Sequence, residues 1–231
     1  MARRRQLSLF PFDDREHAGR VLARDLQTEL AGDADAVVVG LARGGIVVAA
    51  SVARALGLPL EAIAVRKVRH PLQAEYALGA VAPGGPPYLR ARNGLTHEQL
   101  VIAIATAHRE ARALDRTLHR DRPPLSLLGR MAVLVDDGLA TGATMIAAAR
   151  WARGLRVRRV VAAAPVGARQ TVELLRPEVD DVVCPYAVDD LGAIGLWYAD
   201  FSAVGDEEVL ELLQADEARH PMPWATTATT P

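Results

Sequence analysis

The chain has 231 residues, of which 50% are hydrophobic and 24% charged, and its formal net charge is −1. This composition excludes a disordered chain and suits a globular protein that folds without disulfides or metal. The near-neutral charge excludes a general attraction to nucleic acid, so an anion site must be local. No segment approaches the ~20 apolar residues of a membrane span. The single cysteine, Cys184, lies in an apolar run, and we expect a small core residue in a cytoplasmic protein.

The pattern predicts one domain over residues 13–215, preceded by an arm at 1–12 and followed by a flexible tail at 216–231. Asp13 with Glu16 resembles a capping box that opens a helix to about Ala31, and Thr96 with Gln99 resembles a second. Further helices are expected at 46–56, 96–119, 143–153, 168–175 and 206–213. Strands are expected at 37–39, 62–68, 131–135, 157–164 and 179–184, with two short ones at 77–81 and 88–91.

This alternation of strands and helices predicts an α/β fold with a doubly wound, mostly parallel sheet and helices on both faces. In such sheets, ligands bind beyond the carboxyl ends of the strands. Chemistry is therefore expected in the loops after Val39, Lys67, Val135 and Cys184.

The loop after the 131–135 strand carries the strongest signal, in the segment Val133–Met145, VLVDDGLATGATM. Backbone N–H groups at a helix N-terminus favour an anion such as phosphate, and two glycines would let the backbone approach it closely. Asp136 and Asp137 can only accept hydrogen bonds, which suits neighbouring sugar hydroxyls. Phosphate donors beside acceptors for a diol describe a sugar phosphate.

This segment resembles the signature of the type I phosphoribosyltransferases, which bind 5-phosphoribosyl 1-pyrophosphate (PRPP). VVVGLARGG, VRK, ALGAVA and LWYADF follow in the expected order, so the resemblance covers roughly residues 15–215. It implies that Asp136 and Asp137 hold the ribose hydroxyls and that Mg²⁺ sits near them, mainly on PRPP itself. The residues implied for the 5-phosphate are Gly138, Leu139, Ala140, Thr141, Gly142, Ala143 and Thr144.

Two further strand ends are implied to bind pyrophosphate. Arg43, Gly44 and Gly45 follow the first strand, and the family often has a strained, sometimes cis, peptide here, for which Ala42–Arg43 is the candidate. Lys67 with Arg66 is expected to end the second strand. The structural alternatives are a glycine-rich turn with a solvated arginine, and a solvated pair of cations.

Residues 69–82 correspond to the mobile loop of the family, which closes over PRPP. Glu75 is a weak catalytic candidate there, and His70 is expected to be solvated. Trp197 and Tyr198 have two open interpretations: a wall against which the base stacks, or a hydrophobic cluster that anchors the last helix.

The sequence therefore predicts transfer of the phosphoribosyl group from PRPP to a nitrogenous base, with Mg²⁺ and release of pyrophosphate. The resemblance also implies a homodimer, and neither nucleic acid nor a membrane is expected as a partner. One alternative is a regulator that binds PRPP or a nucleotide without turnover, since a fold does not decide function. A third possibility is a hydrolase acting on PRPP.

Overall fold

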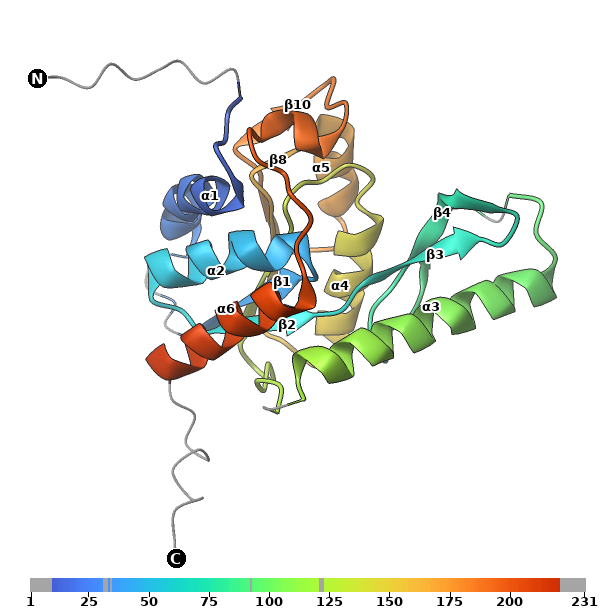
Figure 1. Cartoon of the computed structure of the whole chain (residues 1–231), viewed down its shortest axis with the longest axis horizontal. Coiled ribbons are helices and arrows are strands. Elements are labelled where there is room, and N and C mark those ends of the chain that lie inside the picture. Colours follow the sequence, from blue (N-terminus) through green and yellow to red (C-terminus); the bar gives the residue numbers. More distant parts are fainter. Residues whose placement is uncertain (1–9, 31–32, 34, 92, 121–122, 221–231) are drawn as a thin grey trace, which may run out of the picture.

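A five-stranded parallel sheet forms the centre of the structure, in the strand order β2-β1-β6-β7-β9 (Figure 1). The computed structural model describes residues 10–30, 33, 35–91, 93–120 and 123–220. The sheet strands are β1 (Ala36–Leu41), β2 (Leu60–Ile63), β6 (Met131–Val135), β7 (Arg159–Ala163) and β9 (Asp181–Val183). The predicted α/β class with a mostly parallel sheet is confirmed.

Six α-helices surround this sheet within the described residues. They are α1 (Arg15–Glu29), α2 (Gly44–Leu56), α3 (His97–Leu118), α4 (Ala143–Gly154), α5 (Arg169–Leu175) and α6 (Asp206–Arg219). None of these described helices combines the length and apolar character that a membrane crossing requires.

Alternate residues of the buried strands point to opposite faces of the sheet and build two hydrophobic cores. Val37 and Leu134 face the core that α4 and α5 cover. Val38 and Val133 face the core that α1, α2, α6 and the end of α3 cover. Burial on both faces explains why these strands read as continuous apolar runs in the sequence.

The prediction of one strand over 62–68 is wrong, because the chain forms two strands in different sheets there. β2 ends at Ile63 in the parallel sheet, and β3 (Arg66–His70) then pairs antiparallel with β4 (Gln73–Val81). The linking residues Ala64 and Val65 are buried as deeply as the strands, so the apolar run hides the break. With β5 (Tyr88–Leu89) and α3, this ribbon extends away from the main sheet (Figure 1).

A second sheet of two strands, β8 (Val166–Ala168) and β10 (Tyr186–Val188), is absent from the sequence prediction. A short 3₁₀ helix, η1 (Ile194–Trp197), follows it. Phe12, assigned to the N-terminal arm, is fully buried and packs against Tyr198 with ring centroids 5.2 Å apart. Asp14 rather than Asp13 caps α1, accepting from the backbone N–H of His17.

The boundary of the C-terminal tail is also corrected, because α6 continues to Arg219 instead of ending near 213. Asp216, assigned to the tail, is 2% exposed, and its Oδ2 accepts a 2.8 Å hydrogen bond from the backbone N–H of Leu60 on β2. Arg219 donates to Oδ1 of the same carboxylate. The sequence did not predict that Asp216 is buried, because its hydrogen-bond partner lies on a strand distant in sequence.

Asp216→Ala should lower the free energy of unfolding by about 1–3 kcal/mol, because it removes an acceptor from a buried backbone N–H group. Chemical denaturation would measure this loss. Glu211→Ala, at an exposed position of the same helix, is the matched control. Equal stability of the two variants would show that the Asp216 contact contributes little.

Candidate functional site

The acidic segment predicted to bind a sugar phosphate follows β6, the central strand, at its carboxyl end. α4 begins at Ala143, so the loop joins a buried strand to a helix N-terminus, as predicted. Gly142 has a φ of 73°, and a Cβ there would lie 2.9 Å from Thr171 Cγ2, so both conformation and space require glycine. Backbone N–H groups at the start of a helix such as α4 favour an anion.

Hydrogen bonds with β8 and α5 fix the backbone of the signature loop. The Leu139 N–H donates to the Val166 carbonyl on β8, and Thr171 Oγ1 donates to the Ala140 carbonyl. The Leu139 side chain is buried in the main core. Leu139 thus holds the loop in place, while residues 140–144 supply the N–H groups and hydroxyls nearest the start of α4.

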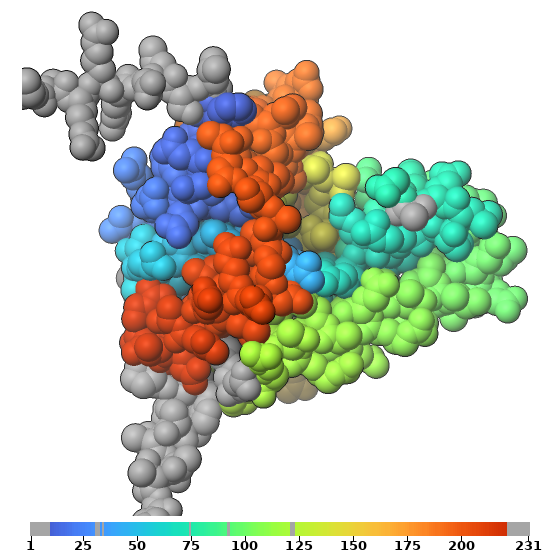
Figure 2. All heavy atoms as spheres, in the orientation of Figure 1, coloured from blue at the N-terminus to red at the C-terminus, as the bar shows by residue number. Residues whose placement is uncertain are grey.

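A cavity of about 440 Å³ lies against the loop. In Figure 2, the yellow region of the chain is recessed between the teal ribbon and the orange segment. The described lining residues are Lys67, Glu75, Tyr76, Ala77, Arg90, Asp136–Thr144 and Ile194. The cavity therefore brings the predicted signature loop together with Lys67 and the weak candidate Glu75.

The two aspartates line the cavity and are partly buried. Asp136 accepts from the Asp137 N–H at 2.9 Å and from Thr144 Oγ1 at 3.3 Å. Burial raises the pKa of Asp136 to about 8, with the Asp137 charge adding to the rise and Lys67 opposing it. Burial also raises the pKa of Asp137, and Arg15, whose Nε lies 2.9 Å from Asp137 Oδ2, opposes that rise.

A second cavity, of about 410 Å³, adjoins the first and shares Lys67, Asp136 and Thr144 with it. Four cationic residues line it: Arg43, Arg66, Lys67 and Arg69. Burial and the nearby Arg43 charge lower the pKa of Arg66. Glu110 is the acidic counterpart among the residues described around this cavity besides Asp136, so cations outnumber carboxylates there, which favours an anionic ligand.

The peptide bond between Ala42 and Arg43 is cis, as the resemblance implies. Arg43 Nε donates to Asp206 Oδ1 at 2.6 Å, and Gly44 and Gly45 open α2. A Cβ on Gly44 would lie 2.1 Å from Asp137 Oδ2, so this loop packs directly against the acidic segment.

Trp197 and Tyr198, for which a base wall was one of two interpretations, are not among the residues that line the 440 Å³ cavity. Trp197 is half-buried, donates from Nε1 to the Leu191 carbonyl and lines a separate depression with Pro11. Tyr198 is 2% exposed, and its hydroxyl donates to the Asp137 carbonyl at 2.6 Å. Ile194 is the residue of this segment that lines the 440 Å³ cavity, and the aromatic pattern of the sequence did not indicate it.

The segment 69–82, expected as a mobile loop, is largely the β3–β4 ribbon. Tyr76 and Arg90 on this side of the cavity went unnoticed in the sequence, because pairing of the ribbon with β5 brings them to it. His70 is 7% exposed and accepts from the Leu72 N–H through Nδ1, so the expectation of a solvated histidine is wrong. Its partners are local and structural.

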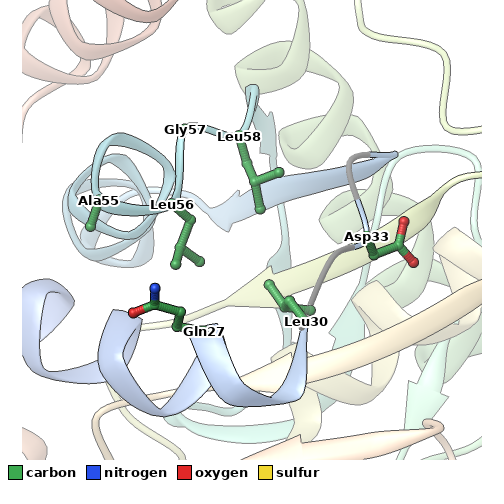
Figure 3. Close-up of a pocket in the computed structure, with 7 residues that line it drawn as sticks. All are labelled: Gln27, Leu30, Asp33, Ala55, Leu56, Gly57 and Leu58. Carbon is green, nitrogen blue, oxygen red and sulfur yellow. The ribbon is translucent and has the colours of Figure 1, made fainter.

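Other features of the described chain are less suited to chemistry. A cavity of about 380 Å³ lies between the C-terminal ends of α1 and α2 (Figure 3), at the opposite edge of the sheet from the signature loop. Asp33, the acidic residue that lines it, is paired with Arg158.

Cys184 packs against the core, and burial raises the pKa of its thiol to about 12, which suits a core residue rather than a nucleophile.

Comparison with known proteins places this geometry in a family. The sequence profile described as "Phosphoribosyl transferase domain" matches residues 12–192. The chain therefore belongs to the phosphoribosyl transferase domain family.

Individual relatives agree with this assignment. "Putative phosphoribosyl transferase Rv0571c" of Mycobacterium tuberculosis is 39% identical over 214 residues, covering 87% of this chain and 46% of that protein. The chain thus spans about half the length of the curated relatives that it matches. The crystal structure of TT1426 from Thermus thermophilus is 41% identical, with a TM-score of 0.75 over 88% of this chain and 98% of that chain. The AQ2163 protein from Aquifex aeolicus, at 12% identity and a TM-score of 0.50 over 78% of each chain, shares the fold.

The buried acidic pair predicts a specific pH dependence of stability. The pKa of Asp136 is about 8 in the folded chain, against about 4 when unfolded. Between these values the folded state holds more protons, so this group lowers stability as pH rises, by at most about 1.4 kcal/mol per pH unit. Asp136→Asn removes that cost, and its melting temperature relative to wild type should rise from about pH 4 to about pH 8 and then level off.

Asp25→Asn, at an exposed position on α1, is the control and should keep a constant offset from wild type. Calorimetric scans at each pH measure both variants. Parallel curves for wild type and Asp136→Asn would contradict the raised pKa.

Proposed function

We propose that this chain binds PRPP and transfers its 5-phosphoribosyl group to a nitrogenous base, with release of pyrophosphate. The observation that carries the proposal is the pair of adjoining cavities, one lined by the signature loop and one by four cations, which share Lys67, Asp136 and Thr144. PRPP has two phosphate-bearing ends separated by a ribose, which matches two adjoining cavities that have Asp136 in common.

The 5-phosphate would bind where residues 140–144 enter α4. Backbone N–H groups and the helix dipole favour a dianion there, and Thr141 and Thr144 add hydroxyl donors. Asp136 and Asp137 would accept hydrogen bonds from the ribose 2- and 3-hydroxyls. These sugar contacts fix the position of C1 relative to the cationic cavity.

The pyrophosphate would bind in the cationic cavity through Arg43, Lys67 and Arg66. In the transfer step, a nitrogen lone pair of the acceptor forms a bond to C1 while the C1–O bond breaks, and that electron pair leaves with pyrophosphate. Fixed cations stabilise the charge that develops on the leaving group, and positioning lowers the barrier further. A covalent protein intermediate is not required.

The donor set fits a Mg²⁺ ion carried chiefly by the substrate. Among the residues that the structure describes, no cluster of three or more His, Cys, Asp or Glu side chains could hold a metal. Magnesium commonly uses one or two carboxylates together with substrate oxygens, and Asp136 and Asp137 are the carboxylates in reach. When bound, the ion would supply charge neutralisation of the pyrophosphate.

The acceptor base would enter between η1 and the ribbon. Ile194 and Tyr76 line the cavity from these two sides, and Arg90 and Glu75 add one group of each charge. A flat aromatic acceptor suits an apolar wall opposite an aromatic ring. This assignment replaces Trp197 and Tyr198 as the proposed base wall.

The central test is calorimetric titration with PRPP in the presence of Mg²⁺. We expect saturable binding and a higher melting temperature, because a ligand that binds only the native state stabilises it. Asp137→Asn should weaken PRPP binding by roughly 1.5–3 kcal/mol, the range for a hydrogen bond to a charged group, while the circular dichroism spectrum is retained. Asp25→Asn is the exposed control.

Turnover separates the remaining functions. Release of pyrophosphate that requires an added base supports the transferase, and release with water alone indicates a hydrolase. Binding of PRPP without release for any base of a broad panel indicates a regulator. Absence of PRPP binding by the wild-type chain would overturn the proposal.

The acceptor wall predicts different phenotypes for two aromatic residues. Tyr76 is 42% exposed, so Tyr76→Ala should leave stability nearly intact and raise the KM for the acceptor by about fivefold, near 1 kcal/mol. Trp197→Ala should instead lower the melting temperature and leave acceptor KM unchanged, since Trp197 lines a separate depression. The opposite pattern would restore Trp197 to the base site.

A further inference from the structure

Asp137 accepts hydrogen bonds from two side chains that are not among the residues lining the 440 Å³ cavity. Arg15 Nε, from α1, donates to Asp137 Oδ2 at 2.9 Å. The Tyr198 hydroxyl donates to the Asp137 carbonyl at 2.6 Å. Gly44 leaves the space in which the carboxylate lies, since a Cβ there would overlap Oδ2. Both side-chain and backbone positions of Asp137 therefore depend on residues far away in sequence.

Arg15 is itself held on two further sides. Its Nη1 group donates to the Ser202 carbonyl at 2.8 Å, and its guanidinium carbon lies 3.8 Å from the centroid of the Phe201 ring. The side chain is 11% exposed, against 16% for that of Asp137. It lines a depression with Ser202 on the side away from the proposed ligand. An arginine so placed contacts the acidic segment and not the cavity.

We propose that Arg15 is a positioning residue that fixes the Asp137 carboxylate in the orientation in which it accepts a ribose hydroxyl. The inference rests on the proposed function, because it assigns a sugar to Asp137. Arg15 uses Oδ2, and a carboxylate keeps further acceptor capacity on Oδ1, which remains for the sugar.

Charge and shape both make arginine the residue for this position. A carboxylate removed from water needs a counter-charge, and Arg15 supplies one to Asp137. The planar guanidinium donates in two directions and stacks on a ring at once. A lysine ammonium would keep the charge without the fixed fork, so it should restore the function only in part.

An ion pair with a purely structural role would share this geometry, and ligand affinities distinguish the two roles. The variants are Arg15→Gln and Arg15→Lys, with Arg20→Gln as control. Arg20 lies on the same helix with a 55% exposed side chain, and its ion pair with Glu16, at 3.7 Å, is exposed as well. Affinities for PRPP, ribose 5-phosphate and pyrophosphate are measured by calorimetry on each variant, in wild-type and Asp137→Asn backgrounds.

We expect Arg15→Gln to weaken PRPP and ribose 5-phosphate binding by about ten- to a hundredfold, from the strength of a charged hydrogen bond. Pyrophosphate affinity should not change, because the cationic cavity is separate. Arg15→Lys should lie between the two, and Arg20→Gln should match wild type. In the Asp137→Asn background, Arg15→Gln should cause no further loss, because both changes remove one interaction.

Equal losses in both backgrounds, or an equal loss for pyrophosphate, would overturn the positioning role. A crystal structure of Arg15→Gln supplies a readout that needs no ligand: we expect the Asp137 carboxylate to turn from its present orientation, and an unmoved carboxylate would also overturn the role. Failure of the proposed function has a different signature, since wild type would then bind neither PRPP nor ribose 5-phosphate.

Discussion

Two adjacent carboxylates at the end of a buried strand set the main electrostatic constraint on this structure. Burial raises the pKa of both Asp136 and Asp137, and the Asp137 charge adds to the rise at Asp136, so nearby cations are needed to favour the charged forms. Lys67 supplies positive charge on the cavity side, and Arg15 supplies it from behind. The β3–β4 ribbon carries Lys67, and α1 carries Arg15.

Segments near the two ends of the described chain meet beside the acidic loop. Phe12 pairs with Tyr198, whose hydroxyl reaches the Asp137 carbonyl. Phe201 lies under the Arg15 guanidinium, and Asp206 holds Arg43. The segment from Tyr198 to Asp206 therefore connects the acidic loop, α1 and the cis-peptide loop. Of its two aromatic residues, Tyr198 is buried beneath the acidic loop, whereas Phe201 is 37% exposed and lies against the Arg15 guanidinium.

The parallel sheet gives the site its two compartments. β1 and β6 are neighbours, so the loops that follow them meet at one edge of the sheet. The first loop brings Arg43, and the second brings the carboxylates and the start of α4. The β3–β4 ribbon closes the remaining side with Lys67 and Tyr76. Cations and carboxylates thus come to share one rim although they are distributed along the chain from residue 43 to residue 137.

Sequence patterns revealed the features whose causes are local. The apolar runs at 37–39 and 131–135 became β1 and β6, the Thr96–Gln99 capping box opens α3, and the signature loop lies between a strand and a helix as its residues require. Gly142 could be identified from the sequence because a positive φ at the start of a helix favours glycine. Asp136 and Asp137 could be identified because acidic residues directly after a buried strand are unusual unless they bind a ligand. The α/β class followed from alternation alone.

Tertiary structure decided the features that depend on partners distant in the chain. The break between β2 and β3 is invisible in the sequence, because Ala64 and Val65 are as apolar and as buried as the strands they join. The sequence places Asp216 in a loose tail, whereas in the structure it accepts a hydrogen bond from a backbone N–H of β2. The role proposed for Arg15 depends on a carboxylate 122 residues away. The conformation of η1 decides that Ile194, rather than Trp197, lines the cavity. A local pattern records the chemistry of a side chain, whereas burial and pairing decide which surface that chemistry reaches.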